Sequence, residues 1–361
     1  MAGGGTGGHV MPLIAVAAEL RGQGGKCLFI GTRNGMEAAL APKHGFPIEW
    51  IEIGGINRAG LRKMLWSALQ LPAAVLRARR ILKSHRAAAV FSTGGYAAGP
   101  TVIAAILTGT PVVAVEPNAI PGIVSRLTAR WVRHALVSFD QTIRHFPPGR
   151  AERAGLPIRE EFFRIAPPAP DAPFHVLVTG GSRGARSLNK AAREAWPVLR
   201  EGAPRVSMTL QCGPSEEAEL KAAFEGSGLD GEVTAFLDGM PAAYARASLI
   251  VSRSGAGAVS EIAAAGRPSI LVPFPFAADG HQKHNALAMA RAGAAVMIED
   301  RDLDGASLAR AIIDFAADPE RARSMGAAAR SLAMPGAARR AAGLLRECAG
   351  NIDRVRKPPE Q

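Results

Sequence analysis

The chain has 361 residues, of which 48% are hydrophobic and 5% aromatic, and its formal net charge is +12. This length predicts two domains, each with enough apolar residues for an ordinary buried core. No run of about 18 apolar residues is present, which argues against a membrane-spanning helix, and the N-terminus lacks the pattern of a secretory signal. The three cysteines, Cys27, Cys212 and Cys348, show neither metal-ligand nor disulfide spacing, which favours a reducing compartment.

The positive charge is concentrated in the N-terminal part of the chain. Residues 1–155 hold 18 basic and 7 acidic side chains, whereas residues 156–361 hold 25 and 24. We therefore expect the N-terminal part to face an anionic partner such as a phosphate group or an acidic lipid surface. Nucleic acid is not expected as a partner, because no basic motif interleaved with aromatic residues accompanies the charge.

Short apolar runs alternate with helical spacing along the chain, which predicts parallel α/β sheets. A first series of strands is expected at residues 26–31, 48–53, 87–92, 111–116 and 135–139. A second series is expected at residues 175–179, 206–211, 232–236, 249–252, 269–273 and 295–298. The two series predict two Rossmann-like domains, joined by the proline-rich stretch 156–171. Only Met1 and Ala2 precede the first glycine-rich loop, so the first strand is either very short or begins upstream.

Three glycine-rich loops each follow a strand position and precede a helix, at residues 3–9, 92–100 and 180–185. Backbone N–H groups at such helix N-termini bind phosphate. The first two loops belong to one domain and are expected at the same sheet edge, where they could hold a diphosphate. Gly3, Gly5 and Gly8 formally match the dinucleotide fingerprint, but residues 31–33 supply no acid to hold a ribose, so NAD binding is not favoured.

Several polar residues also lie at expected strand ends. Glu116 is the one acid between Glu52 and Asp140, and it is either an active-site carboxylate or a surface or capping group. Glu261 follows the small residues 254–258 and is placed to accept hydrogen bonds from a ribose, although a first-turn acid is also common without a ligand. Two further clusters, His281 with His284 and Asp300 with Asp302 and Asp304, are interpreted as a polar turn and a solvated helix cap rather than metal sites.

Taken together in this order, these motifs are similar to those of the peptidoglycan N-acetylglucosaminyltransferases of glycosyltransferase family 28. The similar segments are residues 4–9, 94–96, 116–118, 155–159, 180–185, 253–256, 259–266, 281–282 and 285–286. The resemblance implies a GT-B fold, in which two Rossmann-like domains face each other across a cleft. Residues 1–158 would bind the acceptor, residues 159–335 would bind the donor, and residues 336–361 would form a helix and tail that pack back on the first domain.

The resemblance also implies roles for individual residues. The acceptor diphosphate would be held by Thr6, Gly94, Gly95 and Tyr96, together with Gly7 and Gly8. In the donor site, Arg159 and Ser182 would face the phosphates, Leu237 the uracil, Glu261 the ribose and Gln282 the sugar. The complete set implied for UDP-GlcNAc comprises Thr6, Gly7, Gly8, Asn118, Arg159, Ser182, Leu237, Ala256, Gly257, Ala258, Val259, Ser260, Glu261 and Gln282.

The reaction that the resemblance implies is an inverting transfer of N-acetylglucosamine from UDP-GlcNAc to the C4 hydroxyl of a muramyl-pentapeptide on diphospho-undecaprenol. Such a reaction serves peptidoglycan synthesis, and with it cell shape and division. His9 and Glu116 are the candidate bases, and the imidazole of His9 is preferred. No cofactor and no metal is expected, because Arg159 and loop N–H groups could stabilise the leaving diphosphate.

Two other functions compete with this interpretation. A sugar-nucleotide epimerase on the same fold would need no lipid acceptor, which would leave the basic N-terminal part unexplained. A non-catalytic sugar-nucleotide-binding subunit would keep Glu261 but would not need His9.

Residues 58–86 predict contact with an anionic membrane. The segment carries eight basic residues and no acid, interleaved with apolar residues that include Trp66, and Pro72 is expected to divide it into two helices. Part of the apolar set must pack on the sheet, but a basic, amphipathic, tryptophan-bearing stretch is also typical of an interfacial anchor. We therefore expect a peripheral protein on the cytoplasmic face of the plasma (inner) membrane.

Overall fold

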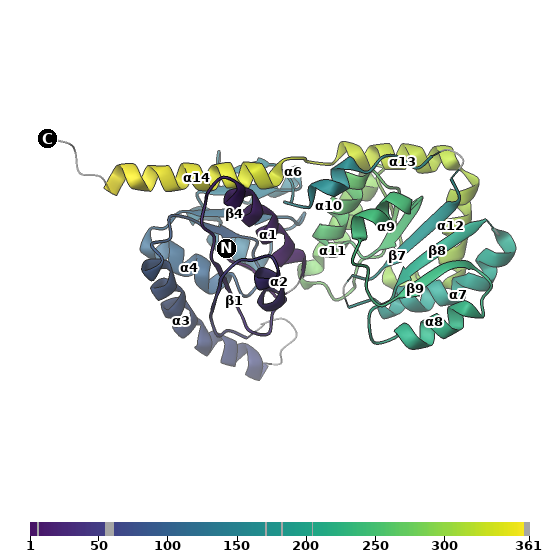
Figure 1. Ribbon diagram of the computed structural model, residues 1–361, viewed down its shortest axis with the longest axis horizontal. Helices are drawn as coiled ribbons and strands as arrows, with labels where there is room; N and C mark the ends of the chain where they lie inside the picture. The colour runs from purple at the N-terminus through teal and green to yellow at the C-terminus, as the bar shows by residue number, and fades with distance from the viewer. Residues whose placement is uncertain (6, 55–60, 170–171, 182, 204, 357–361) are drawn as a thin grey trace. The chain divides into compact units, whose positions relative to one another are not determined.

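The computed structural model describes residues 1–5, 7–54, 61–169, 172–181, 183–203 and 205–356, with no account of the side chains of 61–68 and 351–356. The chain forms two compact units (Figure 1). Unit 1 consists of Met1–Ile158 with Met334–Gln361, and unit 2 consists of Arg159–Ala333. Each unit is an α/β structure with parallel strands, as the alternation of strand and helix patterns predicts.

The parallel sheet of unit 1 is assembled around Ala2. On one side β1 (Phe29–Gly31) pairs with β2 (Ile48–Trp50), and on the other side the strands follow the order β3, β4, β5, β6. Those four strands span Val90–Ser92, Val112–Glu116, His134–Val137 and Ala151–Arg153. Ala2 forms parallel bridges to Ile30 and to Ser92, and its N–H donates to the carbonyl of Phe91 at 2.8 Å. Ala2 therefore occupies the central position of the sheet, where a first strand is expected.

Helices cover both faces of this sheet. They are α1 (Gly7–Gly22), α2 (Glu37–Lys43), α3 (Leu61–Ser84), α4 (Gly99–Thr108), α5 (Ile123–Thr128), η1 (Ala129–Trp131), α6 (Asp140–Ile143) and α14 (Ala337–Arg356). On one face, α3 and α4 pack on the strands with their alanine, valine and isoleucine side chains. On the other face, α1 and α14 lie side by side (Figure 1). Helix α1 is buried on more than one side, through Val10, Pro12, Leu13, Ile14, Val16 and Ala17.

The expectation that Pro72 divides the basic segment into two helices is wrong. Pro72 lies inside the single helix α3. A proline in a helix removes one backbone hydrogen bond, but tertiary packing can hold the helix through it. Here Ala74, Ala78 and Ile81 are buried against the sheet.

Unit 2 contains a six-stranded parallel sheet in the order β12, β11, β10, β7, β8, β9. In chain order these strands are β7 (Phe174–Thr179), β8 (Val206–Gln211), β9 (Asp230–Thr234), β10 (Leu249–Ser252), β11 (Ser269–Leu271) and β12 (Val296–Met297). This is the order of a dinucleotide-binding Rossmann sheet, in which the direction of winding reverses between the first and fourth strands, here β7 and β10.

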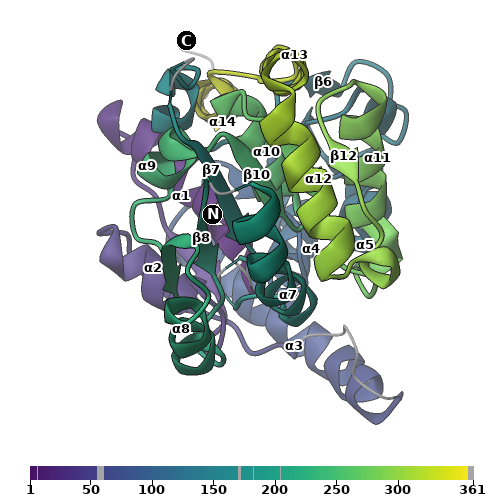
Figure 2. The same ribbon diagram turned by 90° about the vertical axis from the view of Figure 1, so that its right-hand side faces the viewer.

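The helices of unit 2 also form two layers. They are η2 (Glu160–Arg164), α7 (Arg186–Gly202), α8 (Glu217–Glu225), α9 (Met240–Arg246), α10 (Ala256–Ala265), η3 (Ala278–Gly280), α11 (His281–Arg291), η4 (Asp300–Asp302), α12 (Gly305–Ala317) and α13 (Pro319–Ser331). On one face α7 and α12 lie side by side (Figure 2). Trp196 of α7 also contacts Phe224 of α8 edge to face, with the ring centroids 5.0 Å apart. This layer and its strands share one hydrophobic cluster. Throughout the described residues, no helix is long and apolar enough to cross a lipid bilayer.

Candidate functional site

Both sheets place their glycine-rich loops where the winding reverses. In unit 1, residues 3–8 follow Ala2 and residues 93–96 follow β3, the strand on the other side of the reversal. In unit 2, residues 180–185 follow β7 and residues 253–255 follow β10. Ligands of open α/β sheets bind outside the carboxyl ends of the strands at this point. Each unit therefore has a candidate binding edge of its own.

Glu37 holds the first glycine-rich loop of unit 1. Its buried carboxylate accepts hydrogen bonds from the N–H of Gly5 at 2.8 Å and from the N–H and hydroxyl of Thr32, both at 2.9 Å. A Cβ on Gly4 would lie 2.3 Å from this carboxylate, so the loop can approach it only as glycine. Sequence reasoning found no acid after β1 and missed Glu37, which binds the loop backbone. The N–H of Gly5 is thus bound by a carboxylate of the protein, whereas the sequence predicts that N–H groups of this loop bind phosphate.

The second loop of unit 1 lies against the first. Its Thr93 hydroxyl donates to the carbonyl of His9 at 2.9 Å, and a Cβ on Gly95 would lie 3.6 Å from Nε2 of His9. The ring of Tyr96 packs on Gly5, where a Cβ would come within 2.8 Å of it. Gly94 and Gly95 have φ values of 73° and 80°, which favour glycine. The structure therefore brings His9, Gly94, Gly95 and Tyr96 together, while Gly7 and Gly8 begin α1 and Thr6 lies outside the described residues.

Glu116 organises the loop that follows β4. Its side chain is 3% exposed, so the alternative of a surface carboxylate is wrong. Oε1 accepts from the backbone N–H and the side-chain amide of Asn118, both at 3.1 Å, and Oε2 accepts from the N–H of Gly122 at 3.0 Å. Gly122 precedes α5, and a Cβ on Gly94 would lie 4.0 Å from the hydroxyl of Ser125 in that helix. The Glu116 loop and the second glycine-rich loop thus meet at the same edge.

In unit 2, the N-terminus of α10 provides open space. The helix is preceded by Gly255, and a Cβ added to Gly255 or Gly257 would meet no atom within 4 Å. Val259 is buried, whereas Ala256, Gly257, Ala258 and Ser260 are partly accessible. A helix N-terminus carries partial positive charge. Small residues here leave room for a ligand beside it.

Glu261 lies one turn into α10 and is only partly accessible. Burial raises the pKa of its carboxyl to about 7, and the guanidinium of Arg159 lowers this pKa in part. Arg159 itself lies over the ring of Phe162, 5.0 Å from the ring centroid. Phe162 in turn contacts Tyr244 edge to face at 5.1 Å. Arg159 thus lies near enough to Glu261 to interact with it electrostatically, and its guanidinium packs on the ring of Phe162.

Two arginines, the buried Arg267 and the partly accessible Arg330, hold the segments around this arrangement. Within the described residues, each hydrogen bond that they donate ends on a main-chain carbonyl: those of Tyr244, Ala245 and Ala166 for Arg267, and those of Phe163, Ile165, Ala264 and Ala265 for Arg330. Burial, together with the nearby Arg330, lowers the pKa of Arg267 to about 10, so it stays charged at neutral pH. The C-termini of α9, α10 and η2 are thereby joined.

Of the other residues expected in the donor site, Ser182, Leu237 and Gln282 belong to unit 2, whereas Gly7, Gly8 and Asn118 belong to unit 1. Leu237 is half-buried in the loop between β9 and α9, and Ser182 lies outside the described residues. Two residues after Ser182, Gly184 has φ +70° and approaches Cys212 so closely that a Cβ would lie 1.8 Å from the carbonyl oxygen of Cys212. Gln282 is in the first turn of α11, where its Oε1 accepts from the N–H of Phe274 at 3.0 Å.

The interpretation of the acidic cluster near residue 300 is partly wrong. Asp304 does cap α12, since it accepts from the N–H of Ser307 at 2.7 Å. Asp300, however, is no solvated cap, because it forms a 2.6 Å ion pair with Arg253. Sequence reasoning missed this pair. In the described part of the chain, no group of three or more His, Cys, Asp or Glu residues is placed to hold a metal ion.

Comparisons with known proteins identify the family. Residues 1–137 match the model of the glycosyltransferase family 28 N-terminal domain, and residues 175–341 match that of the family 28 C-terminal domain. A protein of Solibacter usitatus (strain Ellin6076) is 52% identical over 349 residues, which cover 97% of this chain and 95% of that protein. Its name is UDP-N-acetylglucosamine--N-acetylmuramyl-(pentapeptide) pyrophosphoryl-undecaprenol N-acetylglucosamine transferase.

Solved structures give the same result. The crystal structure of Acinetobacter baumannii MurG superposes with a TM-score of 0.79 at 30% identity, covering 95% of this chain and 97% of that chain. A UDP-GlcNAc 2-epimerase from Neisseria meningitidis also matches, with a TM-score of 0.65 over 94% of this chain and 97% of that one. Its identity is 12%, which shows a shared fold and no more. The GT-B fold class is confirmed, and the chain belongs to glycosyltransferase family 28.

Proposed function

We propose that the chain transfers N-acetylglucosamine from UDP-GlcNAc to the C4 hydroxyl of a muramyl-pentapeptide linked through diphosphate to undecaprenol. The observation that carries this proposal is the 52% identity to a protein named for that reaction, which extends over 97% of the chain and includes both units. The loops of each unit supply chemistry that suits one of the two substrates.

Unit 2 is suited to bind the donor. The open space at the N-terminus of α10 would receive the nucleotide, and the carboxylate of Glu261 would accept hydrogen bonds from the ribose hydroxyls. Arg159, whose positive charge lowers the pKa of the Glu261 carboxyl, would bind the diphosphate. Its guanidinium would stabilise the negative charge of the departing UDP. Gln282 would contact the sugar.

Unit 1 is suited to bind the acceptor and to carry the base. The loops around Gly5 and Gly95 would bind the acceptor diphosphate, and Nε2 of His9 lies directly against Gly95. We assign the base to His9, because both carboxylate oxygens of Glu116 already accept hydrogen bonds from their own loop. Glu116 would then act by positioning Asn118.

In the reaction, the acceptor C4 oxygen would attack the anomeric carbon of N-acetylglucosamine from the face opposite UDP. The bond from that carbon to the UDP oxygen would break, the proton of the hydroxyl would pass to His9, and the configuration would invert. The residues of the chain supply the base and the positive charge that this step needs.

A lipid-linked acceptor requires the protein to work at a membrane surface. Large apolar side chains are exposed on neighbouring elements of unit 1: Leu69 (75%) and Leu76 (51%) on α3, Leu107 (66%) on α4, Ile123 (63%) and Leu127 (65%) on α5, and Trp131 (48%) on η1. Exposed basic residues accompany them, among them Arg79, Arg80, Lys83, Arg126 and Arg130. Such a surface is typical of peripheral binding to anionic lipid.

We therefore extend the membrane-binding surface beyond the segment expected from the sequence. Arg58 lies outside the described residues, as do the side chains of Arg62, Lys63 and Trp66. The exposed residues of α4, α5 and η1 were missed, because these short helices carry their exposed apolar residues without the accompanying run of basic residues that marks residues 58–86. The location that follows is the cytoplasmic face of the plasma membrane, where UDP-sugars are available.

The test is an incubation with labelled UDP-GlcNAc and a lipid-linked muramyl-pentapeptide acceptor, followed by separation of the lipid products. We expect a disaccharide lipid and UDP, both dependent on the acceptor. An isomerised sugar nucleotide formed without acceptor would establish the epimerase alternative. Binding of UDP-GlcNAc with no product under any condition would establish the non-catalytic alternative.

A further inference from the structure

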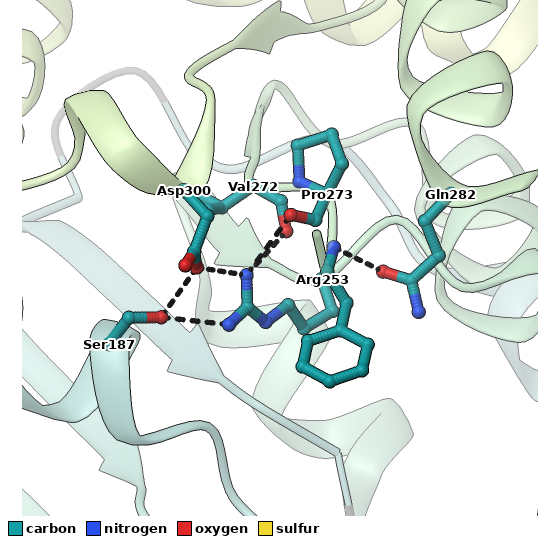
Figure 3. A network of polar contacts seen from close by, with 7 residues as sticks. Ser187, Arg253, Val272, Pro273, Gln282 and Asp300 are labelled. Carbon is teal, nitrogen blue, oxygen red and sulfur yellow. Dashed lines mark hydrogen bonds and ion pairs between the residues drawn. The ribbon is translucent and has the colours of Figure 1, made fainter. Parts of the chain in front are cut away.

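A single guanidinium joins the loops at the carboxyl edge of the unit 2 sheet (Figure 3). Arg253 directly follows β10, and its Nη1 donates to Asp300 at 2.6 Å, beyond β12. The same nitrogen donates to the carbonyls of Val272 at 3.1 Å and Pro273 at 3.3 Å, beyond β11. Its Nη2 donates to the hydroxyl of Ser187 at 2.7 Å, in the first turn of α7.

This network is closed and largely withdrawn from water. The hydroxyl of Ser187 donates to the same oxygen of Asp300 at 2.6 Å, so Ser187, Arg253 and Asp300 form a ring of charge-assisted hydrogen bonds. The side chains of Arg253 and Asp300 are 13% and 22% exposed. The ring uses two guanidinium nitrogens in a fixed fork, which a lysine ammonium cannot reproduce.

The network continues to Gln282 through the loop that Arg253 holds. Next to Pro273, the N–H of Phe274 donates to Oε1 of Gln282 at 3.0 Å, and the guanidinium of Arg253 lies 5.4 Å from the Phe274 ring centroid. Ser254, the residue after Arg253, donates its hydroxyl to the carbonyl of Gln282 at 2.8 Å. Both the main chain and the side chain of Gln282 are thus tied to residues that Arg253 positions.

The hydrogen bond from the N–H of Phe274 determines which end of the Gln282 amide faces a ligand. A backbone N–H can donate only to the oxygen of the amide, so Oε1 must face Phe274 and Nε2 must face the other way. Gln282 therefore presents N–H donors, which match the hydroxyl or carbonyl oxygens of a sugar. Without the Phe274 bond, the amide could turn over and present its oxygen instead.

We propose that Arg253, together with Asp300 and Ser187, is a positioning group that fixes the amide of Gln282 for recognition of the donor's sugar. This inference rests on the proposed function, because it takes UDP-GlcNAc as the donor. Two parts of the donor are then bound by different residues. Gln282 and the residues that position it bind the sugar, whereas Glu261 and Arg159 bind the UDP part.

The test compares the affinities of UDP and UDP-GlcNAc by calorimetric titration of the full chain. In Arg253→Lys we expect UDP affinity to stay within twofold of that of the unchanged protein, and UDP-GlcNAc affinity to fall about three- to tenfold, as for the loss of one or two neutral hydrogen bonds. Gln282→Ala should show the same selective loss, and the double variant should lose no more than either single variant, because both act through one contact. Arg301→Gln, at an exposed neighbour of Asp300, is the control and should change neither affinity.

Other outcomes overturn the inference. Equal losses of both affinities in Arg253→Lys, unchanged affinities, or additive losses in the double variant would each show that Arg253 does not act through Gln282. If Arg253→Lys does not fold, Ser187→Ala, which removes a single link of the ring, must show the selective loss in weaker form or the inference fails. If the unchanged protein binds neither UDP nor UDP-GlcNAc, the proposed function itself is wrong.

Discussion

The two units fix the segments around their candidate sites with opposite chemistry. In unit 1, the buried carboxylates of Glu37 and Glu116 accept hydrogen bonds from loop N–H groups. In unit 2, the guanidinium groups of Arg253, Arg267 and Arg330 donate to main-chain carbonyls. The side chains that fix these segments are therefore acidic in unit 1 (Glu37 and Glu116) and basic in unit 2 (Arg253, Arg267 and Arg330). We call each of these sets the polar framework of its unit.

This difference explains the charge that each unit offers to a ligand. Glu37 and Glu116, two of the few acids of unit 1, are buried against the loops that they bind. The exposed charged residues of that unit are therefore mainly basic. In unit 2, arginines cover carbonyl groups at helix C-termini, whose partial negative charge would oppose an anionic ligand. Glu261 remains there as the carboxylate that we propose binds the ribose.

The largest effect is expected for His9→Ala, since His9 is the proposed base in unit 1. A positioned base contributes about 10²–10⁴-fold to turnover, and the variant should lose that factor at saturating substrate. The measurement is the rate of disaccharide-lipid formation, with His145→Ala, at an exposed position of unit 1, as the control. If Glu116→Gln abolishes turnover and His9→Ala retains it, then Glu116 is the base and His9 is not.

The basic surface of unit 1 should bind anionic vesicles. Each basic residue near such a surface contributes about 1 kcal/mol, so replacing Arg79, Arg80 and Lys83 by Gln should weaken binding roughly fivefold per residue. Cosedimentation at low salt measures this, and added salt should reduce binding by screening. The matched control replaces Lys221, Arg291 and Arg310 of unit 2, which are also exposed. Equal losses in the two triple variants would show that unit 1 has no special role at the membrane.

Glu37→Gln should destabilise unit 1. The carboxylate accepts three hydrogen bonds, and a glutamine would turn its own N–H groups toward one of these donors. A buried N–H left unsatisfied costs about 1–3 kcal/mol, which urea denaturation can measure. The control is Glu49→Gln, which breaks the exposed ion pair with Arg77 and should cost about 0–1 kcal/mol. A Glu37→Gln protein as stable as the Glu49→Gln control would show that the hydrogen bonds to the Glu37 carboxylate do not stabilise unit 1.

The smallest effect concerns pH. Because burial raises the pKa of Glu261 to about 7, a substantial fraction of this group is protonated just below neutral pH. If the carboxylate accepts the ribose hydroxyls, UDP affinity should rise with pH, by up to about tenfold per pH unit below 7, and level off above pH 8. Calorimetry between pH 5.5 and pH 8.5 measures the profile, which should be flat in Glu261→Gln. A sloping profile in that variant would assign the titration to another group.

The parts of the structure that follow from local pattern could be predicted from the sequence. The expected strands 206–211 and 249–252 coincide with β8 and β10, and the glycine-rich loops begin where those patterns place them. The short edge strand β6 was missed, since its three residues carry no apolar run. The polar frameworks were missed for a different reason. Glu37 meets Gly5 across 32 positions of sequence and Arg253 meets Asp300 across 47, and no local pattern records such contacts.

The most direct test of the division between the units is the UDP affinity of Glu261→Gln beside that of His9→Ala, measured by calorimetry at pH 8. We expect Glu261→Gln to lose about ten- to hundredfold in affinity, because each charge-assisted hydrogen bond to the ribose contributes about 1.5–3 kcal/mol. His9→Ala, in the unit proposed to bind the acceptor, should bind UDP within twofold of the unchanged protein. Unchanged affinity in Glu261→Gln, or a large loss in His9→Ala, would contradict the assignment of unit 2 as the donor-binding unit.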